Sequence, residues 1–308
     1  MNIQSKSPVT PLRQRMVEDM AARKLGRHSR HSYLSSCERF AAFLEGSPET
    51  ASADDIRRFQ LFLIESGASI CSRNRIMTGV RFLFRVTLRR HDLAAEIYHL
   101  KEPQKVPVVM SRDEIKRLLA MAANLKLRAM LSLAYGCGLR AGEVVRLKVG
   151  DLDGAQNIIR IVQAKGRKDR NVMLPADTLG LLRLWWKERP RRQDRDVAPA
   201  ERWLFPGRNA GRPLTTRQFA RLFQETVKTA GITKPVTLHS LRHSFATHLL
   251  ERGVDIRVIQ ALLGHDKLET TARYTRVATA MISAVDSPLD DLGTGRRNRK
   301  KTKGQASG

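Results

Sequence analysis

The chain has 308 residues, and 42% of them are hydrophobic, which suits a globular protein with two domains that each bury a core. Its 56 lysines and arginines exceed its 30 aspartates and glutamates and give a formal net charge of +26, so we expect a polyanionic partner, nucleic acid above all. No apolar run is long enough to cross a membrane and the N-terminal residues lack the apolar centre of a signal peptide, so we expect a cytoplasmic protein with no membrane partner.

The positive charge extends over the whole chain. Residues 1–110 carry 18 basic and 11 acidic side chains, residues 111–285 carry 32 and 16, and residues 286–308 carry 6 and 3. A single basic tail on a neutral enzyme is therefore excluded, and we expect both domains to face the same phosphate backbone.

The first hundred residues predict an N-terminal domain, residues 1–100, of four helices. Apolar positions recur three or four residues apart over 11–24, 30–45, 53–66 and 72–89, with turn residues between these segments. Basic residues on the other faces are either solvated surface or DNA contacts, and the positive balance of the domain favours DNA contacts for part of them: Arg23, Lys24, Arg27, Arg30, Arg57, Arg58, Arg73, Arg75, Arg81, Arg89 and Arg90.

The next segments indicate a linker and a second domain. Two prolines within residues 101–110 predict an extended linker, and a capping box formed by Ser111 and Glu114 predicts the helix that opens a domain over residues 111–285. β-Branched segments at 157–163 and 171–174 predict a hairpin, whereas most of the remaining segments have helical periodicity. The expected fold class is therefore mainly α with a small antiparallel β-sheet (α+β), followed by a basic, disordered tail over residues 286–308.

Two places in the second domain present basic side chains on tight turns. Gly136 and Gly138 allow a turn that brings Arg140 to the start of a short helix, with Glu143 beside it. For an arbitrary pair of this spacing, a surface ion pair is the simpler interpretation. Lys165 lies at the basic tip of the predicted hairpin, where basic residues also serve solubility alone.

The stretch from 237 to 277 holds half of the eight histidines. An apolar stripe predicts a helix that carries His239 and Arg242 three residues apart on another face. A second predicted helix ends at Gly264, where a left-handed cap is usual, so His265 lies just past a helix end and Tyr274 in the first turns of a further helix.

Metal and cofactor chemistry are poorly supported. His239 and His243 have a spacing that can place two imidazoles on one metal, but no glutamate lies between them and the neighbouring Arg242 disfavours a cation. The sequence contains no phosphate-binding glycine loop, so we expect no nucleotide cofactor. The three cysteines are too far apart for a zinc site or a disulfide framework, and we expect them to be packing residues: Cys37, Cys71 and Cys137.

These residue types fit the cleavage of a phosphodiester without a metal. Two arginines can hold the extra negative charge of the transition state, a tyrosine oxygen can attack phosphorus, and a lysine or histidine can give a proton to the departing oxygen. The side chains that supply these roles are Arg140, Lys165, His239, Arg242, His265 and Tyr274.

In this order, the motifs resemble those of tyrosine recombinases of the phage integrase and Xer type, and the resemblance covers nearly the whole chain. The motifs are Gly-Leu-Arg140-Ala-Gly-Glu143, Lys165-Gly-Arg-Lys, His239-Ser-Leu-Arg242-His-Ser-Phe-Ala-Thr-His-Leu-Leu, Leu-Leu-Gly-His265 and Thr-Thr-Ala-Arg-Tyr274-Thr. Each is weak alone, but together they are highly specific.

The resemblance implies an N-terminal SAM-like core-binding domain and a catalytic domain that clamp double-stranded DNA at specific recombination sites. It implies a site-specific recombinase that cuts and rejoins strands through a 3′-phosphotyrosyl intermediate without metal or ATP, and that works as a tetramer on DNA. The residues after the tyrosine, 277–285, would pack on a neighbouring subunit.

The same resemblance implies a role for each site residue. Arg140 and Arg242 would bind the scissile phosphate, Lys165 would be the general acid toward the 5′ oxygen, and Tyr274 would form the phosphotyrosyl bond. His239 would act in proton transfer, His265 would hydrogen-bond the phosphate, and Glu143 would support the pocket.

Two alternatives remain open at this point. The biological task could be integration, integron-like recombination, transposition or chromosome dimer resolution. The chain could also be a non-catalytic DNA-binding architectural or regulatory protein derived from a recombinase, although the presence of all six site residues favours an active enzyme. Gly142 departs from the pattern, since many relatives have a larger residue there, and it lowers helix propensity by roughly 1 kcal/mol.

Overall fold

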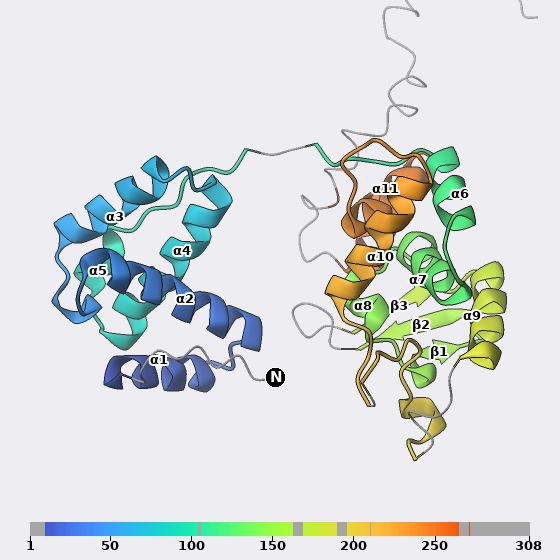
Figure 1. Ribbon diagram of the computed structural model, residues 1–308, viewed down its shortest axis with the longest axis horizontal. Helices are drawn as coiled ribbons and strands as arrows, with labels where there is room; N and C mark the ends of the chain where they lie inside the picture. The colour runs from blue at the N-terminus through green and yellow to red at the C-terminus, as the bar shows by residue number, and fades with distance from the viewer. Residues whose placement is uncertain are drawn as a thin grey trace, which may run out of the picture. The chain divides into compact units, whose positions relative to one another are not determined.

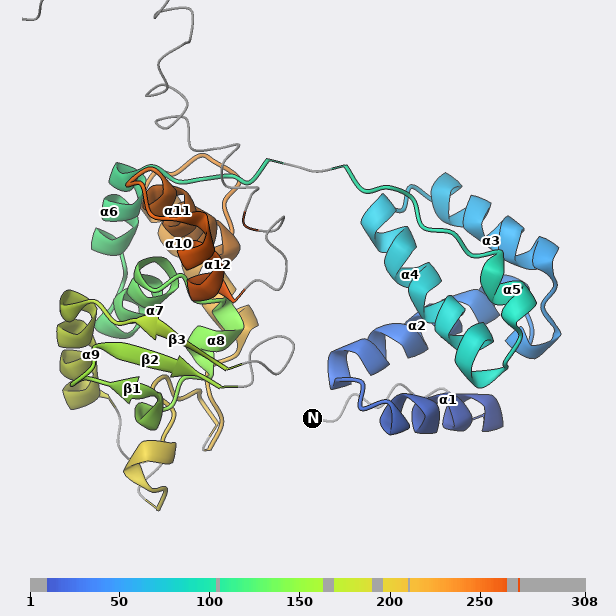
Figure 2. The same cartoon turned by 180° about the vertical axis from the view of Figure 1, so that it is seen from behind.

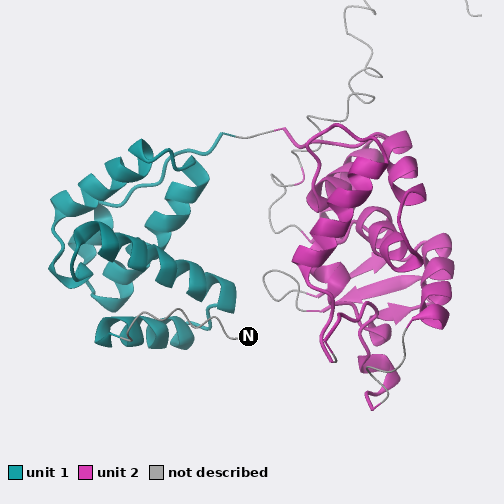
Figure 3. Cartoon of the chain, in the orientation of Figure 1, with its two compact units in different colours: residues 1–104 teal, residues 105–308 magenta. Residues whose placement is uncertain are grey.

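The computed structural model of the chain describes residues 10–103, 106–162, 169–189, 196–209, 211–264 and 271. The chain divides into two compact units, Met1–Gln104 and Lys105–Gly308 (Figure 3). Within the described ranges both units are mainly helical, and the strands belong to one three-stranded sheet in the second unit. None of the described helices is long and apolar enough to cross a membrane.

The first unit contains the four predicted helices and a fifth, short helix that was not predicted (Figure 1). A π-type turn, Leu83–Thr87, continues α4, and a 3₁₀ turn, Pro48–Thr50, precedes α3. The helices are α1 Pro11–Ala22, α2 Arg27–Leu44, α3 Ala53–Glu65, α4 Ile70–Phe82 and α5 His91–Ala95.

An aromatic core holds the first unit together. The ring of Phe40 on α2 lies 5.0 Å from that of Phe59 on α3 and 5.9 Å from that of Phe84, measured between centroids, and all three side chains are fully buried. Ser52 starts α3 with a capping box, in which its hydroxyl accepts from the N–H of Asp55 and the Asp55 carboxylate accepts from the N–H of Ser52. The apolar positions that predicted these helices thus form the buried core of the first unit.

The prediction that Arg73 lies on an exposed face was wrong, because this side chain is only 1% exposed. Its guanidinium donates to the carbonyl oxygen of Tyr98 and to Oε1 of Gln60, both at 2.9 Å, and lies over the Tyr98 ring. The neighbouring Asn74 pairs with the main chain of Leu100. Buried charges require such partners, and here they hold the segment that leaves the unit against α4.

The segment predicted as a linker, residues 101–110, is bound at both of its ends. Leu100 is held by Asn74 in the first unit. Met110 is fully buried in the second unit, where its N–H donates to Oγ of Ser244 at 2.9 Å and the carbonyl oxygen of the adjacent Val109 accepts from Lys234.

The second unit combines helices with a small antiparallel sheet in the order β1-β2-β3, in which Ile159 pairs with Val172 and Ile161 with Arg170 (Figure 2). The hairpin was predicted, whereas β1 was not, and the helix predicted at the capping box of Ser111 and Glu114 is α6, which a separate helix, α7, follows. The elements are α6 Arg112–Ala120, α7 Leu125–Gly136, α8 Ala141–Val145, β1 Leu152–Asp153, β2 Ile158–Ile161, β3 Arg170–Met173, α9 Ala176–Glu188, α10 Thr216–Thr229, α11 Leu238–Leu250 and α12 Ile256–Leu263, with 3₁₀ turns at Val149–Asp151 and Pro199–Glu201.

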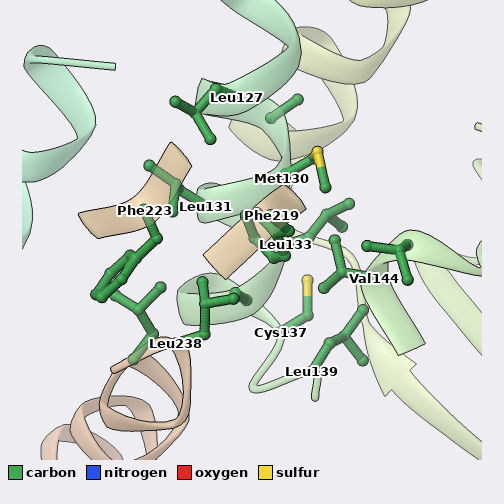
Figure 4. Close-up of a cluster of buried hydrophobic side chains, with 14 of the residues drawn as sticks. Leu127, Met130, Leu131, Leu133, Cys137, Leu139, Val144, Phe219, Phe223 and Leu238 are labelled. Carbon is green, nitrogen blue, oxygen red and sulfur yellow. The ribbon is translucent and has the colours of Figure 1, made fainter. Parts of the chain in front are cut away.

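Helix α7 is the centre of the core of the second unit. It packs against α9, α11 and α8, and Figure 4 shows its leucine side chains, including Leu131 and Leu133, next to Phe219 and Phe223 of α10. Cys137, just after α7, is 1% exposed, and burial raises the pKa of its thiol to about 12. This cysteine is therefore a protonated packing residue. The residues that follow it, Gly138 to Arg140, form the turn that leads into the site.

Candidate active site

The turn from α7 to α8 requires glycine at position 138. Gly138 has φ +62°, and a Cβ atom there would lie 2.5 Å from a ring carbon of Phe245 on α11. Only glycine combines this left-handed backbone with such a close approach. The turn then places Arg140 as the N-cap of α8, as the sequence predicted, with its side chain 24% exposed.

Glu143 is the buried anion of the site and contacts two arginines. Its Oε2 accepts from the main-chain N–H of Arg140 at 2.8 Å, and its Oε1 accepts from Nη1 of Arg140 at 2.9 Å. The same two oxygens accept from Nη2 and Nη1 of Arg170 at 2.8 and 3.0 Å, a bidentate pair between side chains that are 8% and 6% exposed. The simpler interpretation, a surface ion pair of Arg140 and Glu143, is therefore wrong, because the Glu143 side chain is buried.

The ionisation of Glu143 follows from these contacts. Burial raises the pKa of its carboxyl, but the hydrogen bonds and charge of Arg170, followed by those of Arg140, outweigh this effect and lower the pKa from 4.5 to about 2. Glu143 is therefore a permanent negative charge that fixes the direction of the Arg140 side chain.

Sequence reasoning missed Arg170, which appeared only as the last basic residue of the hairpin tip. It begins β3, and its Nε donates to the carbonyl oxygen of Leu262 at 3.0 Å in addition to the pair with Glu143. No local pattern indicated these contacts, because its partners lie 27 and 92 positions away in the sequence. Arg170 thus connects the hairpin, α8 and α12.

Arg242 on α11 is fully buried, although the predicted apolar stripe of this helix lies on another face than His239 and Arg242. Its Nη1 donates to the carbonyl oxygen of Gly138 at 2.7 Å, and its Nη2 donates to that of Leu263. The second arginine of the site therefore contacts the turn that carries the first, and both guanidiniums reach the C-terminal end of α12.

Three guanidiniums meet the C-terminal end of α12, and we call this arrangement the carbonyl clamp. Arg170 donates to the carbonyl oxygen of Leu262, Arg242 to that of Leu263, and Arg140 to that of Gly264 at 3.4 Å. Helix C-termini expose unpaired carbonyl oxygens and carry partial negative charge, so cations stabilise them. Gly264 has φ +61° and caps the helix as predicted, and a Cβ atom there would lie 2.9 Å from Cδ of Arg170.

The three described histidines of α11 differ in environment. His239 is exposed at the surface, and its pKa is lowered by partial desolvation of the ring and by the positive charges of Arg242 and Arg140. The ring of His243 meets that of His239 edge to face, with centroids 4.5 Å apart. His248 is buried and its Nδ1 forms a 2.9 Å hydrogen bond with the hydroxyl of Tyr135, which is a structural contact.

Of the proposed site residues, the described part of the chain places Arg140, Glu143, His239 and Arg242 near one another. Lys165, His265 and Tyr274 lie outside the described residues, as do residues 277–285 and the basic tail. The described chain leads to two of them, because Ile161 and Arg170 pair at the base of the hairpin that carries Lys165, and Gly264 immediately precedes His265. Among the described side chains, no group of three or more His, Cys, Asp or Glu residues is arranged to hold a metal ion.

The helical first unit, the small sheet and two arginines that meet at the end of α12 are the features of a tyrosine-type site-specific DNA recombinase. The model of the phage integrase family matches residues 108–281, and the model of the phage integrase N-terminal SAM-like domain matches residues 12–92. The chain belongs to the phage integrase family.

Individual relatives match over most of their length. A putative integrase/recombinase of Sinorhizobium fredii is 42% identical over 286 residues, covering 92% of this chain and 90% of the relative. Tyrosine recombinase XerD of Oceanobacillus iheyensis is 33% identical over 277 residues, covering 84% of this chain and 91% of the relative.

Solved structures show the same fold. The crystal structure of XerA recombinase is similar with a TM-score of 0.51 and 29% identity, covering 88% of this chain and 95% of the other. The Tn1549 transposon integrase, solved in complex with circular intermediate DNA, is similar with a TM-score of 0.65 at 19% identity, covering 89% of this chain and 99% of the other. The second likeness concerns the fold alone.

Proposed function

We propose that the chain recombines double-stranded DNA at specific sites by cutting and rejoining strands through a 3′-phosphotyrosyl intermediate. The observation that carries this proposal is the meeting of Arg140 and Arg242, from separate helices, at the C-terminal end of α12. Two guanidiniums at one place can bind the non-bridging oxygens of a phosphodiester with paired donors.

In the proposed reaction, the hydroxyl oxygen of Tyr274 attacks phosphorus and forms a new P–O bond to the 3′ side of the strand. The bond to the 5′ oxygen breaks, and Lys165 gives this oxygen a proton as it leaves. The hydroxyl proton of Tyr274 is taken up by His239, whose lowered pKa favours a neutral ring that can accept a proton. Rejoining runs the same steps in reverse, with a 5′ hydroxyl as the nucleophile.

The remaining residues stabilise the transition state. Arg140 and Arg242 offset the additional negative charge of the pentacoordinate phosphorus, and His265 donates a hydrogen bond to a phosphate oxygen. Glu143 keeps Arg140 in place, since its ionised carboxylate accepts from both the main chain and the side chain of that residue. Arg242 is fully buried, so we propose that DNA binding includes a local rearrangement that exposes its guanidinium.

The proposed assembly is a tetramer on DNA, in which residues 277–285 of one subunit pack on the next. The high positive charge of both units supports a DNA partner. The names of the relatives, an integrase/recombinase and XerD, support integration, transposition or resolution of DNA as the biological task.

The test is covalent capture of DNA. Wild-type protein is incubated with a library of duplexes that carry nicks, so that a cleaved strand diffuses away and the protein stays attached to the DNA. We expect a protein–DNA adduct that survives denaturing electrophoresis, and sequencing of the attached DNA identifies the target site. Tyr274→Phe should bind the same DNA without forming an adduct.

Tyr135→Phe is the matched control. It also removes a tyrosine hydroxyl from the second unit, but this hydroxyl forms a hydrogen bond with His248 and has no proposed role in the reaction. An adduct with the Tyr274→Phe variant would assign the nucleophile to another residue. A wild-type protein that binds DNA but forms no adduct with any duplex would favour the non-catalytic DNA-binding alternative.

A further inference from the structure

A cavity of about 880 Å³ lies beside Arg140 and extends the site away from the carbonyl clamp. Residues of α8, of the following 3₁₀ turn and of β2 line it, together with Glu201 and Trp203. Besides Arg140, the basic residues of its lining are Arg146, Lys148 and Arg160.

Most charges of this cavity are already compensated by neighbouring side chains. Lys148 forms an ion pair with Glu201 and lies over the ring of Trp203, and Arg160 lies 3.7 Å from the carboxylate of Asp153. Arg140 is paired with Glu143, as described above. Arg146 differs from them, because it is exposed and forms no ion pair with any carboxylate in the described part of the chain.

Gly142 determines where the guanidinium of Arg146 lies. These residues are four positions apart, one turn of α8, and therefore share a face of the helix. A Cβ atom at Gly142 would lie 3.1 Å from Nη2 of Arg146, 3.5 Å from Nη1 and 3.6 Å from Cζ. The guanidinium thus lies against the bare main chain of residue 142, two positions after Arg140, and a Cβ atom at 142 would make it shift by a few tenths of an ångström.

We propose that Arg146, admitted by Gly142, forms a second phosphate subsite that binds a DNA backbone phosphate next to the scissile one. The inference rests on the proposed function, because it takes the phosphate at Arg140 as the scissile one. Phosphates follow one another every 3.4 Å of helix axis along a strand. Arg140 and Arg146 line the same cavity, so a strand whose scissile phosphate binds Arg140 brings a neighbouring phosphate of the same backbone within reach of Arg146.

The chemistry of the subsite is that of a guanidinium, without an ion pair among the described residues, toward a phosphodiester oxygen. Arg146 needs no carboxylate to be displaced before it binds, unlike Lys148, which must first leave Glu201. Its contact is with the backbone and reads no base, so it sets the register of the strand relative to Arg140 and does not select the sequence.

The experiment measures the salt dependence of DNA binding, which does not require cleavage. Binding of a short duplex of mixed sequence is followed by fluorescence anisotropy between about 50 and 200 mM salt. Loss of one phosphate contact reduces the slope of log K against log salt by about 0.9, so we expect this reduction for Arg146→Gln. Arg146→Lys keeps the charge and should retain the slope.

Two further variants complete the design. Arg183→Gln removes the same charge from an exposed position on α9, which lies at the opposite end of the sheet from α8 in both views (Figures 1 and 2), and should leave the slope unchanged. Gly142→Ala keeps every charge but crowds the guanidinium against residue 142, and should reduce the slope by part of the Arg146→Gln effect. All four proteins are checked for folding by thermal denaturation.

Equal slopes for the wild type and Arg146→Gln would overturn the subsite, and so would a reduction of the same size in Arg183→Gln. An unchanged slope in Gly142→Ala would overturn the role given to Gly142. These results are independent of the covalent-capture test: a protein that forms no adduct with DNA can still show the Arg146 effect, and an active recombinase can lack it.

Discussion

Removing one partner of the pair between Arg170 and Glu143 should be one of the most destabilising single changes in the second unit. Both side chains are more than nine-tenths buried, and two hydrogen bonds of 2.8 and 3.0 Å join them. Removing one partner of such a pair costs about 3–5 kcal/mol, because the other charge stays buried. The pKa of Glu143, lowered from 4.5 to about 2, corresponds to roughly 3 kcal/mol, of which Arg140 supplies part. We therefore expect Arg170→Met to lower the free energy of unfolding by about 3 kcal/mol.

The measurement is urea denaturation followed by tryptophan fluorescence. All three tryptophans, Trp185, Trp186 and Trp203, lie in the second unit, so the signal reports on that unit alone. Unchanged slopes of the free energy against urea would show that the variants differ in stability and not in the extent of unfolding.

A double-mutant cycle identifies the pair as the cause. Glu143→Gln combined with Arg170→Met should cost less than the sum of the single changes, with a coupling of about 1–3 kcal/mol. Arg58 and Asp54 form a matched exposed pair, 62% and 69% exposed, whose cycle should give less than about 1 kcal/mol. A coupling for Arg170 and Glu143 no larger than that of the exposed pair would refute the reasoning. Because that control lies in the first unit, its unfolding is followed by circular dichroism.

Two further predictions concern glycines and histidines. Gly180→Ala, inside α9 where a Cβ would meet open space, should raise the free energy of unfolding by about 0.5–1 kcal/mol, whereas Gly138→Ala should lower it by about 2 kcal/mol or more; equal effects in thermal denaturation would contradict the packing given for the turn. The lowered pKa values of His239 and His248 mean that the folded chain favours neutral rings, so stability is complete above the unfolded pKa of 6.5 and declines as the pH falls through the lower folded values. Urea midpoints between about pH 8 and pH 5 should therefore fall toward acid, and the combined His239→Gln and His248→Gln changes should flatten this dependence; an equally steep decline in that variant would assign it to other groups.

Local patterns allowed most helices to be predicted. The capping box at Ser111 and Glu114 forms as expected, and Gly264 ends α12 in a left-handed conformation. Both features depend on residues within a few positions of one another, so the sequence contains their cause. The short helix α5 and the two-residue strand β1 were missed because each offers too few residues for a periodic pattern.

The site was predictable where residues are close in sequence and less so where the fold supplies the partner. The pairing of Arg140 with Glu143 follows from their spacing, but the bidentate contact of Arg170 with Glu143 joins residues 27 positions apart. Arg73 shows the same limit in the first unit, since an arginine in a basic helix gives no sign that main-chain and amide oxygens will surround it. Burial of a satisfied charge is a property of the tertiary structure.

The carbonyl clamp has a consequence for how freely α12 can change in sequence. Its three arginines contact main-chain oxygens of residues 262–264, and every amino acid offers the same oxygen. Substitutions on the exposed face of α12, as at Val258, should therefore alter the surface of the helix without moving the guanidiniums. Diversification or engineering of this helix is constrained mainly at Gly264, whose left-handed turn no other residue adopts as readily.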